Sequence, residues 1–311
     1  MAARTLATID VGTNTTLLLV ARVDDDGAIT VLDERAEITR LGRGIGHDGA
    51  LGAEGIAKTL EALRGYAEII RARGARVAAI GTEGLRRASN AADFLGPAAE
   101  ILGAPIEVIA GDREAALTFR AAAESFPDEA RARTLVVVDI GGGSTEIIIA
   151  ERGAVRFRTS LPLGSVRLTE KHVRPDPTSP SSPDEREAIA REVDAALAAV
   201  PWPRDARPLL VGVAGTVTSL AAMALALATY DPARVHGFDL SLPALDGEIA
   251  RLAAATQAER ERFVGLDPRR ADVILAGAIL LGRLARAAGV EAIRVSDRGI
   301  RWGLLYELRD G

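Results

Sequence analysis

The chain has 311 residues, of which 48% are hydrophobic and 26% are charged, with a formal net charge of -5. This length exceeds the size at which a single hydrophobic core keeps growing, so we expect two domains, and the composition excludes a disordered chain. Zero cysteines exclude a disulfide framework, thiolate catalysis and cysteine metal sites, and the negative charge argues against a broad nucleic-acid surface.

The amino terminus and the apolar segments predict the cellular location of the protein. Residues 1–6 lead directly into a strand, without the apolar region of a signal peptide. The apolar helices near Leu220 and Ile274 are interrupted by glycine or polar residues before they reach membrane-spanning length. We therefore expect a cytoplasmic protein that binds neither a membrane nor nucleic acid.

The first strands form a unit that the chain repeats. Residues 6–9 lead into Asp10-Val-Gly-Thr-Asn-Thr-Thr16, and residues 135–138 lead into Asp139-Ile-Gly-Gly-Gly-Ser-Thr-Glu146. Both copies continue into a second alternating strand, turn at a short acidic and glycine segment, and enter a third strand. A single turn of this kind is usually an ordinary hairpin. Two matched copies favour phosphate-binding loops, because glycines let several N–H groups point at an anion and hydroxyls add donors.

The remaining elements alternate between helices and strands. The patterns predict, in chain order, a helix over 51–73, a strand over 76–80 followed by a helix, a strand over 106–110, a helix over 113–126, a proline-rich loop over 174–183, a strand over 209–214, a helix over 215–228, a helix over 269–289, a strand over 292–296 and a helix over 300–308. Polar residues repeatedly follow the strands, at the sheet edge where ligands bind in open α/β folds.

Four motifs stand out in order along the chain. They are Asp10-Val-Gly-Thr-Asn-Thr15, Gly81-Thr-Glu-Gly-Leu-Arg-Arg-Ala-Ser-Asn90, Gly111-Asp-Arg-Glu-Ala-Ala-Leu117 and Asp139-Ile-Gly-Gly-Gly-Ser-Thr-Glu146. Their order and spacing resemble the exopolyphosphatase and guanosine pentaphosphate phosphatase family. Four shorter motifs extend the resemblance to nearly the whole chain: Leu163-Gly-Ser-Val-Arg167, Ala214-Gly-Thr-Val-Thr218, Arg270-Ala-Asp-Val-Ile274 and Ser296-Asp-Arg-Gly-Ile-Arg301.

The resemblance implies an α/β fold with two ribonuclease-H-like, actin-like domains, each with a mixed sheet, and a substrate site in the interdomain cleft. Residues 1–123 would form the N-terminal domain and residues 124–297 the C-terminal domain, with a helix at about residues 298–311 packing back on the first. The chain matches the short form of the family, and the family's dimers imply a homodimer.

The function implied by the resemblance is metal-dependent hydrolysis of a phosphoanhydride. The leading substrate is inorganic polyphosphate, from which terminal orthophosphate would be released, and the alternative is guanosine pentaphosphate. A kinase of the same superfamily is less favoured, because the Gly-x-x-Glu-Ala motif resembles the hydrolases. A non-catalytic nucleotide sensor is also less favoured, because the three carboxylates Asp139, Glu146 and Glu114 are all present.

Each chemical role has candidate residues. Asp139 and Glu146 offer the hard oxygen ligands that Mg²⁺ or Mn²⁺ prefers, and Asp10 is a further candidate at the metal. The resemblance makes Glu114 the base that activates water, and Arg86 can present a guanidinium fork to a phosphate. The residues expected to bind phosphate are Thr13, Asn14, Thr15, Gly142, Gly143, Ser144, Thr145, Gly215 and Thr216.

Simpler interpretations remain open for several of these residues. Glu114 lies near a predicted helix N-terminus, where a carboxylate is favoured by the helix dipole alone. Gly215 and Thr216 could form an ordinary helix start. A long polyphosphate would also need a local basic track, for which the arginines within the motifs are candidates: Arg86, Arg167, Arg270, Arg298 and Arg301. Trp302 stands where the family often has Glu.

Overall fold

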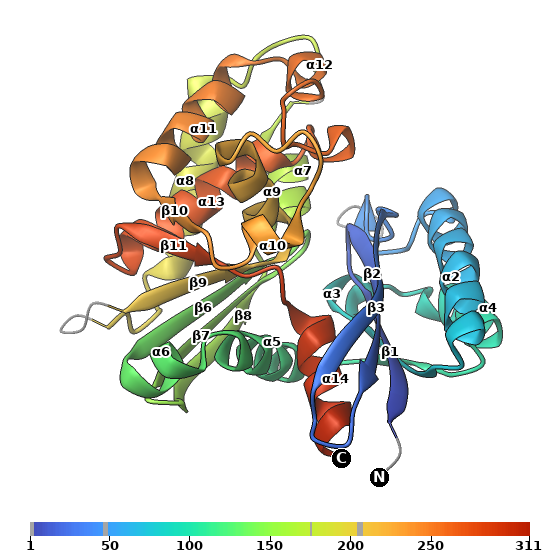
Figure 1. The fold of residues 1–311 in the computed structure, drawn as a ribbon. Coiled ribbons are helices and arrows are strands. Elements are labelled where there is room, and N and C mark those ends of the chain that lie inside the picture. Colours follow the sequence, from blue (N-terminus) through green and yellow to red (C-terminus); the bar gives the residue numbers. More distant parts are fainter. Residues whose placement is uncertain (1–2, 46–48, 175, 204–207) are drawn as a thin grey trace. The chain divides into compact units, whose positions relative to one another are not determined.

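The computed structural model describes residues 3–45, 49–174, 176–203 and 208–311. The chain divides into two compact units, Met1–Ala121 with Ile300–Gly311 and Ala122–Gly299. Each unit is built on its own β-sheet, with five strands in the first and six in the second (Figure 1). In the described part of the chain, no helix is both long and apolar enough to cross a membrane.

The five-stranded sheet of the first unit has the order β3-β2-β1-β4-β5. β1 and β3 each run antiparallel to β2, whereas β4 runs parallel to both β1 and β5. The strands are β1 (Arg4–Val11), β2 (Thr15–Val23), β3 (Ile29–Ile38), β4 (Arg76–Gly81) and β5 (Ile106–Val108). The helices are α2 (Ala53–Arg73), α3 (Glu83–Arg87), α4 (Ala91–Leu102), α5 (Gly111–Ser125), whose last residues belong to the second unit, and α14 (Ile300–Asp310).

The side chains of β1 explain the layers of the first unit. Ile9 and its alternate neighbours pack in one cluster with residues of α2 and α4, whereas Leu6 packs with Trp302 and Leu305 of α14. Successive side chains of a strand point to opposite faces, so this sheet is covered on both faces. Asp10 lies an even number of residues from Leu6 and therefore shares the face that α14 covers.

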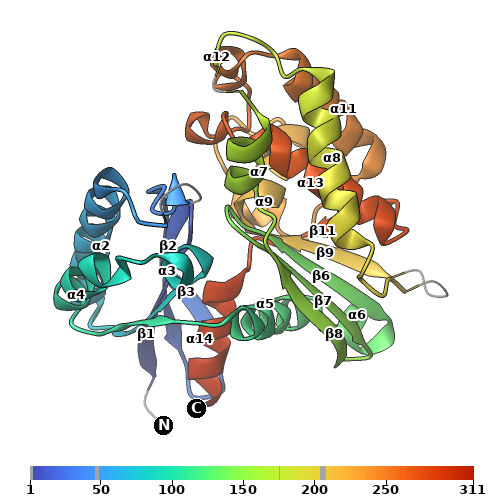
Figure 2. The ribbon, with the colours of Figure 1, turned by 180° about the vertical axis from the view of Figure 1, so that it is seen from behind.

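The sheet of the second unit has the order β10-β11-β9-β6-β7-β8 (Figure 1). Its strands are β6 (Thr134–Ile140), β7 (Thr145–Glu151), β8 (Ala154–Leu161), β9 (Leu209–Val213), β10 (Asp239–Ser241) and β11 (Ala292–Val295). The helices are α6 (Pro127–Ala132), α7 (Ser165–His172), α8 (Pro183–Leu197), α9 (Ala214–Ala224), α10 (Pro232–Val235), α11 (Leu242–Ala254), α12 (Gln257–Arg260) and α13 (Ile274–Ala287), with a 3₁₀ turn at Pro268–Arg270. α7, α8, α9 and α13 gather on one face of the sheet (Figure 2).

The two sheets repeat one pattern. The order β3-β2-β1-β4-β5 in the first unit matches β8-β7-β6-β9-β11 in the second, with the same parallel and antiparallel pairings. The second strand of each copy also carries a register shift at the corresponding place, Val20/Ala21 in one and Ile149/Ala150 in the other. The predicted fold class is confirmed as α/β with two mixed, actin-like sheets, and β10 is an added edge strand.

Two predicted helices differ from the structure by more than two residues at one end. The helix predicted over 269–289 begins only at Ile274, because the Asp267 carboxylate accepts a hydrogen bond from the Arg269 N–H at 2.9 Å and closes a 3₁₀ turn instead. The helix predicted to reach residue 228 ends at Ala224. Ala226, with φ of 49°, adopts the left-handed conformation that ends a helix.

The proline-rich segment 174–183 is the loop that the sequence predicts, with Pro175 outside the described residues. It ends where α8 begins, with Pro183 in the first helical turn. The Ser182 hydroxyl accepts from the Glu185 N–H at 3.3 Å, and the Glu185 carboxylate accepts from the Ser182 N–H at 2.9 Å. This reciprocal cap satisfies two N–H groups that the helix leaves open.

A histidine in the second unit makes stability depend on pH. The His236 ring stacks on Phe126 with centroids 5.3 Å apart, and burial, helped by the Arg298 charge, lowers the pKa of His236 from 6.5 to about 4. Between these two values the unfolded chain binds more protons than the folded chain, so the free energy of unfolding falls as the pH drops through this window.

We expect His236→Phe to keep the ring packing and to remove the loss of unfolding free energy that protonation of His236 causes. Urea unfolding of wild type and variant at pH 7 and pH 5 measures this free energy, and its decrease from pH 7 to pH 5 should be smaller in the variant. An equal drop in both proteins would show that other groups cause the pH dependence.

Candidate functional site

The two glycine turns are closed by equivalent backbone hydrogen bonds. In the first, the Gly12 N–H donates to the Thr15 carbonyl at 3.0 Å, and in the second the Gly141 N–H donates to the Ser144 carbonyl at 3.0 Å. Each turn joins the two central antiparallel strands of its sheet, β1 to β2 and β6 to β7. The sequence repeat therefore becomes a repeat of two equivalent turns, one in each unit.

The carbonyls of the first turn point into the protein. The Thr13 carbonyl accepts from the Gly42 N–H at 2.9 Å, and the Asn14 carbonyl accepts from Thr39 and Arg40 at 3.1 and 3.0 Å. In a trans peptide the next N–H points the opposite way, so the N–H groups of Asn14 and Thr15 face away from this segment. The buried Asn14 Nδ2 has no hydrogen-bond partner among the described residues. A buried donor that is left open fits a site for an anionic oxygen.

The second turn is held by the start of α7. The carbonyls of Gly141 and Gly142 accept from the Ser165 and Val166 N–H groups, both at 3.0 Å. Arg167 Nε donates to the Gly143 carbonyl at 2.9 Å. By the same trans geometry, the N–H groups of Gly143 and Ser144 face away from α7.

Gly164 allows α7 to approach this turn. A Cβ at Gly164 would lie 2.3 Å from the Gly142 carbonyl oxygen, which no real side chain could do. The carbonyls of the turn therefore face α7 and its N–H groups face the other side, as a phosphate-binding turn requires.

Asp139 and Glu146 form a carboxylate pair. They are directly opposite each other in the register of β6 and β7, so their side chains lie on one face of the sheet. Oε1 of the buried Glu146 accepts from the Ser144 and Ser160 hydroxyls at 2.8 and 2.7 Å. Asp10 occupies the corresponding strand position in the first unit and is also buried.

This donor set fits a magnesium ion better than a metal held by protein ligands alone. Among the described residues, no group of three or more His, Cys, Asp or Glu side chains is arranged to hold a metal. Mg²⁺ usually keeps several waters and is bound through one or two carboxylates together with substrate phosphates. Asp139 and Glu146 supply such a pair, and the hydroxyls on Glu146 fix one of its oxygens.

Glu114 and Arg86 are brought together in the first unit. Arg86 Nη1, on α3, donates to Glu114 Oε2 at 2.7 Å and to the Ile109 carbonyl at 2.7 Å. Glu114 lies in the first turn of α5, and only 9% of its side chain is exposed. Arg86 therefore orients the Glu114 carboxylate. The sequence-based prediction gave Arg86 only as a phosphate ligand and did not include this role.

Gly215 and Thr216 lie in the first turn of α9, which begins at Ala214 directly after β9. A Cβ at Gly215 would lie 2.4 to 2.5 Å from the guanidinium atoms of Arg270, so this cation lies against the helix start. Thr216 is buried beside Gly277 of α13, whose added Cβ would lie 2.5 Å from Thr216 Cγ2. Arg270 adds a positive charge at the helix start that was predicted to bind phosphate.

Arg301 and Trp302 have structural positions. Arg301 is buried and pairs with Glu34, so its predicted place on a basic track is wrong. Trp302 is buried in the cluster between α14 and the first sheet. These two residues contribute to the core of the first unit, which explains a tryptophan where a polar residue was expected.

Two contacts of the site were missed from the sequence. Ser160 reaches Glu146 from β8, and Glu83 of α3 accepts from the Thr13 hydroxyl at 3.4 Å. Ser160 carries no local motif, because its place is set by the pairing of Glu146 with Ser160 across β7 and β8. Glu83 lies inside the predicted Gly81 motif, whose glutamate was given no role.

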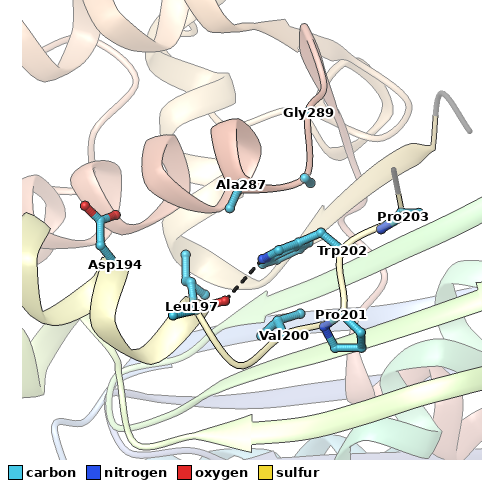
Figure 3. A pocket seen from close by; sticks show the side chains of 10 residues that line it. Asp194, Leu197, Val200, Pro201, Trp202, Pro203, Ala287 and Gly289 are labelled. Carbon is cyan, nitrogen blue, oxygen red and sulfur yellow. Dashed lines mark hydrogen bonds between the residues drawn. The ribbon is translucent and has the colours of Figure 1, made fainter. Parts of the chain in front are cut away.

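A cavity of about 770 Å³ opens where α8 and α13 end (Figure 3). It is lined by Leu197, Val200, Trp202 and Gly289, among others, and the Trp202 indole N–H donates to the Leu197 carbonyl at 3.2 Å. Asp194, another lining residue, accepts a hydrogen bond from Arg283 Nε at 2.6 Å. None of the predicted site residues lines this cavity.

Comparisons with known proteins agree with the geometry. The model of the Ppx/GppA phosphatase family matches residues 19–310. Exopolyphosphatase 2 of Mycobacterium tuberculosis is 35% identical over 322 residues, which cover 99% of each chain. A guanosine-5'-triphosphate,3'-diphosphate pyrophosphatase of Vibrio cholerae is 30% identical, over 97% of this chain and 59% of that protein. The crystal structure of an exopolyphosphatase from Cytophaga hutchinsonii has a TM-score of 0.89 and 28% identity, over 99% of this chain and 98% of that chain.

Proposed function

Because this chain belongs to the Ppx/GppA phosphatase family, we propose that it is an exopolyphosphatase, a hydrolase that releases terminal orthophosphate from inorganic polyphosphate. The observation that carries the proposal is the pair of equivalent glycine turns, with carbonyls turned into the protein and N–H groups turned out. Each turn offers backbone donors to phosphate oxygens, and the buried amide of Asn14 is an additional donor.

Glu114 is the proposed base. A water attacks the terminal phosphorus, the bond from that phosphorus to the bridging oxygen breaks, and the water proton moves to the Glu114 carboxylate. Arg86 Nη1 donates to Glu114 Oε2 at 2.7 Å and so holds this carboxylate in the orientation in which it would accept the proton. The terminal orthophosphate and the shortened polyphosphate then leave.

Asp139 and Glu146 are the residues proposed to hold Mg²⁺ or Mn²⁺, with Asp10 as a further candidate. When bound, such an ion neutralises negative charge on the phosphates. Ser144 and Ser160 keep the Glu146 carboxylate in place at 2.8 and 2.7 Å. Thr145 donates to the Leu163 carbonyl at 2.7 Å, so in this structure its hydroxyl supports the turn.

Guanosine pentaphosphate is the second candidate substrate, favoured by the likeness to the Vibrio cholerae pyrophosphatase. Orthophosphate release from polyphosphates of defined length and from guanosine pentaphosphate, measured side by side, tests the choice. We expect the higher kcat/KM with polyphosphate. A higher value with guanosine pentaphosphate would reverse the assignment, and no release from either would refute the hydrolase. The homodimer and the cytoplasmic location remain predictions from the sequence.

A further inference from the structure

Two helices of the first unit, α5 and α14, touch through their backbones. A Cβ built on Gly303 of α14 would lie 2.0 Å from the Leu117 carbonyl oxygen and 2.6 Å from its carbon. The colliding atoms are backbone atoms, which cannot rotate away, so any side chain at position 303 would push the two helices apart. Close-packed interiors transmit such a displacement to their neighbours.

α14 is tied to the strand that leads into the first glycine turn. The Thr8 hydroxyl of β1 donates to the Arg301 carbonyl at 3.0 Å, and Arg4 Nη2 donates to the Arg309 carbonyl at 2.8 Å. Between them, Leu6 packs in one buried cluster with Leu305. The position of α14 is therefore set by β1.

α5 carries the proposed base one turn before this contact. Glu114 and Leu117 are three residues apart and so lie on neighbouring positions of the helix surface. The ion pairs Arg113–Glu307, at 2.7 Å, and Arg120–Asp310 also join α5 to α14. The contact at Gly303 thus fixes α5 at the level of Glu114, whose carboxylate must meet Arg86 at 2.7 Å.

We propose that Gly303 is a positioning residue for the hydrolysis, because its backbone contact with Leu117 places Glu114 relative to Arg86 and the first glycine turn. The inference rests on the proposed role of Glu114. Since the substrate is held by the glycine turns, a shift of α5 should affect turnover more than binding.

The test is Gly303→Ala, the smallest change that introduces the clash. A displacement of about 1 Å can cost about 10²-fold in rate, so we expect kcat for orthophosphate release to fall by about 10- to 10²-fold with KM changed less than about threefold. Gly65→Ala is the matched control, because an added Cβ on this α2 residue would meet no heavy atom within 4 Å. It should keep the wild-type kcat.

A double variant separates positioning from general damage. If Gly303 acts through Glu114, adding Gly303→Ala to Glu114→Gln should lower kcat by less than about twofold further, because the two changes remove one function. If Gly303→Ala lowered kcat by the same factor in the Glu114→Gln background as in the wild type, the inference would be overturned. A wild-type kcat for Gly303→Ala, measured while Glu114→Gln is impaired, would also overturn it. A wild-type kcat for Glu114→Gln would instead refute the proposed role of Glu114 as the base, and the inference with it, while the exopolyphosphatase activity itself would stand.

If Gly303→Ala does not fold, Glu307→Gln provides a second test of the inference. It weakens the Arg113–Glu307 ion pair without adding atoms at the contact. Because both side chains are more than a third exposed, we expect a drop in kcat of only about twofold, absent in the Glu114→Gln background. The same drop in both backgrounds would contradict the inference.

Discussion

Replacing Glu114 by Gln is expected to lower kcat by about 10²- to 10⁴-fold with little change in KM, because the amide keeps the size of the carboxylate but cannot accept a proton. The variant also retains an oxygen that can accept from Arg86, which donates to Glu114 at 2.7 Å in the wild type. Steady-state orthophosphate release from polyphosphate is the measurement.

Glu68→Gln is a suitable control for this experiment. Glu68 lies on α2 and is exposed, so the same chemical change there should leave kcat unaltered. Near-normal turnover of Glu114→Gln would show that Glu114 only caps α5 and that the base lies elsewhere.

Removal of divalent cations with a chelator is expected to abolish activity, and Mg²⁺ or Mn²⁺ should restore it, because Asp139 and Glu146 present carboxylate oxygens on one sheet face. Asp139→Asn should raise the metal concentration needed for half-maximal activity. Full activity in excess chelator would refute the metal-dependent mechanism.

Ser160→Ala tests whether the hydrogen bond from Ser160 to Glu146 contributes to metal binding. Removal of the hydroxyl that donates to Glu146 at 2.7 Å should weaken metal affinity by about 10- to 10²-fold. The shift of the melting temperature with added Mg²⁺ measures this affinity without any need for turnover. Ser179→Ala, at an exposed position in the proline-rich loop, should leave the shift unchanged.

Much of the site could be predicted from local sequence patterns. The turns at Gly12 and Gly141 follow from strands that end in Asp and glycine, and the strand register then places Asp139 opposite Glu146. The repeat made both turns visible, because each copy has the same order of strand, turn and strand.

The α/β class, the two equivalent turns and the carboxylates around them were determined by the sequence itself, because alternating apolar residues and glycine turns act over a few positions. Only the tertiary structure decided that Ser160 supports Glu146, that Arg86 holds Glu114 and that Arg301 is buried against Glu34. It also decided that Gly303 lies on Leu117. These contacts join residues from different strands and helices, and such pairs are selected by sheet register and by packing of the core rather than by any local preference.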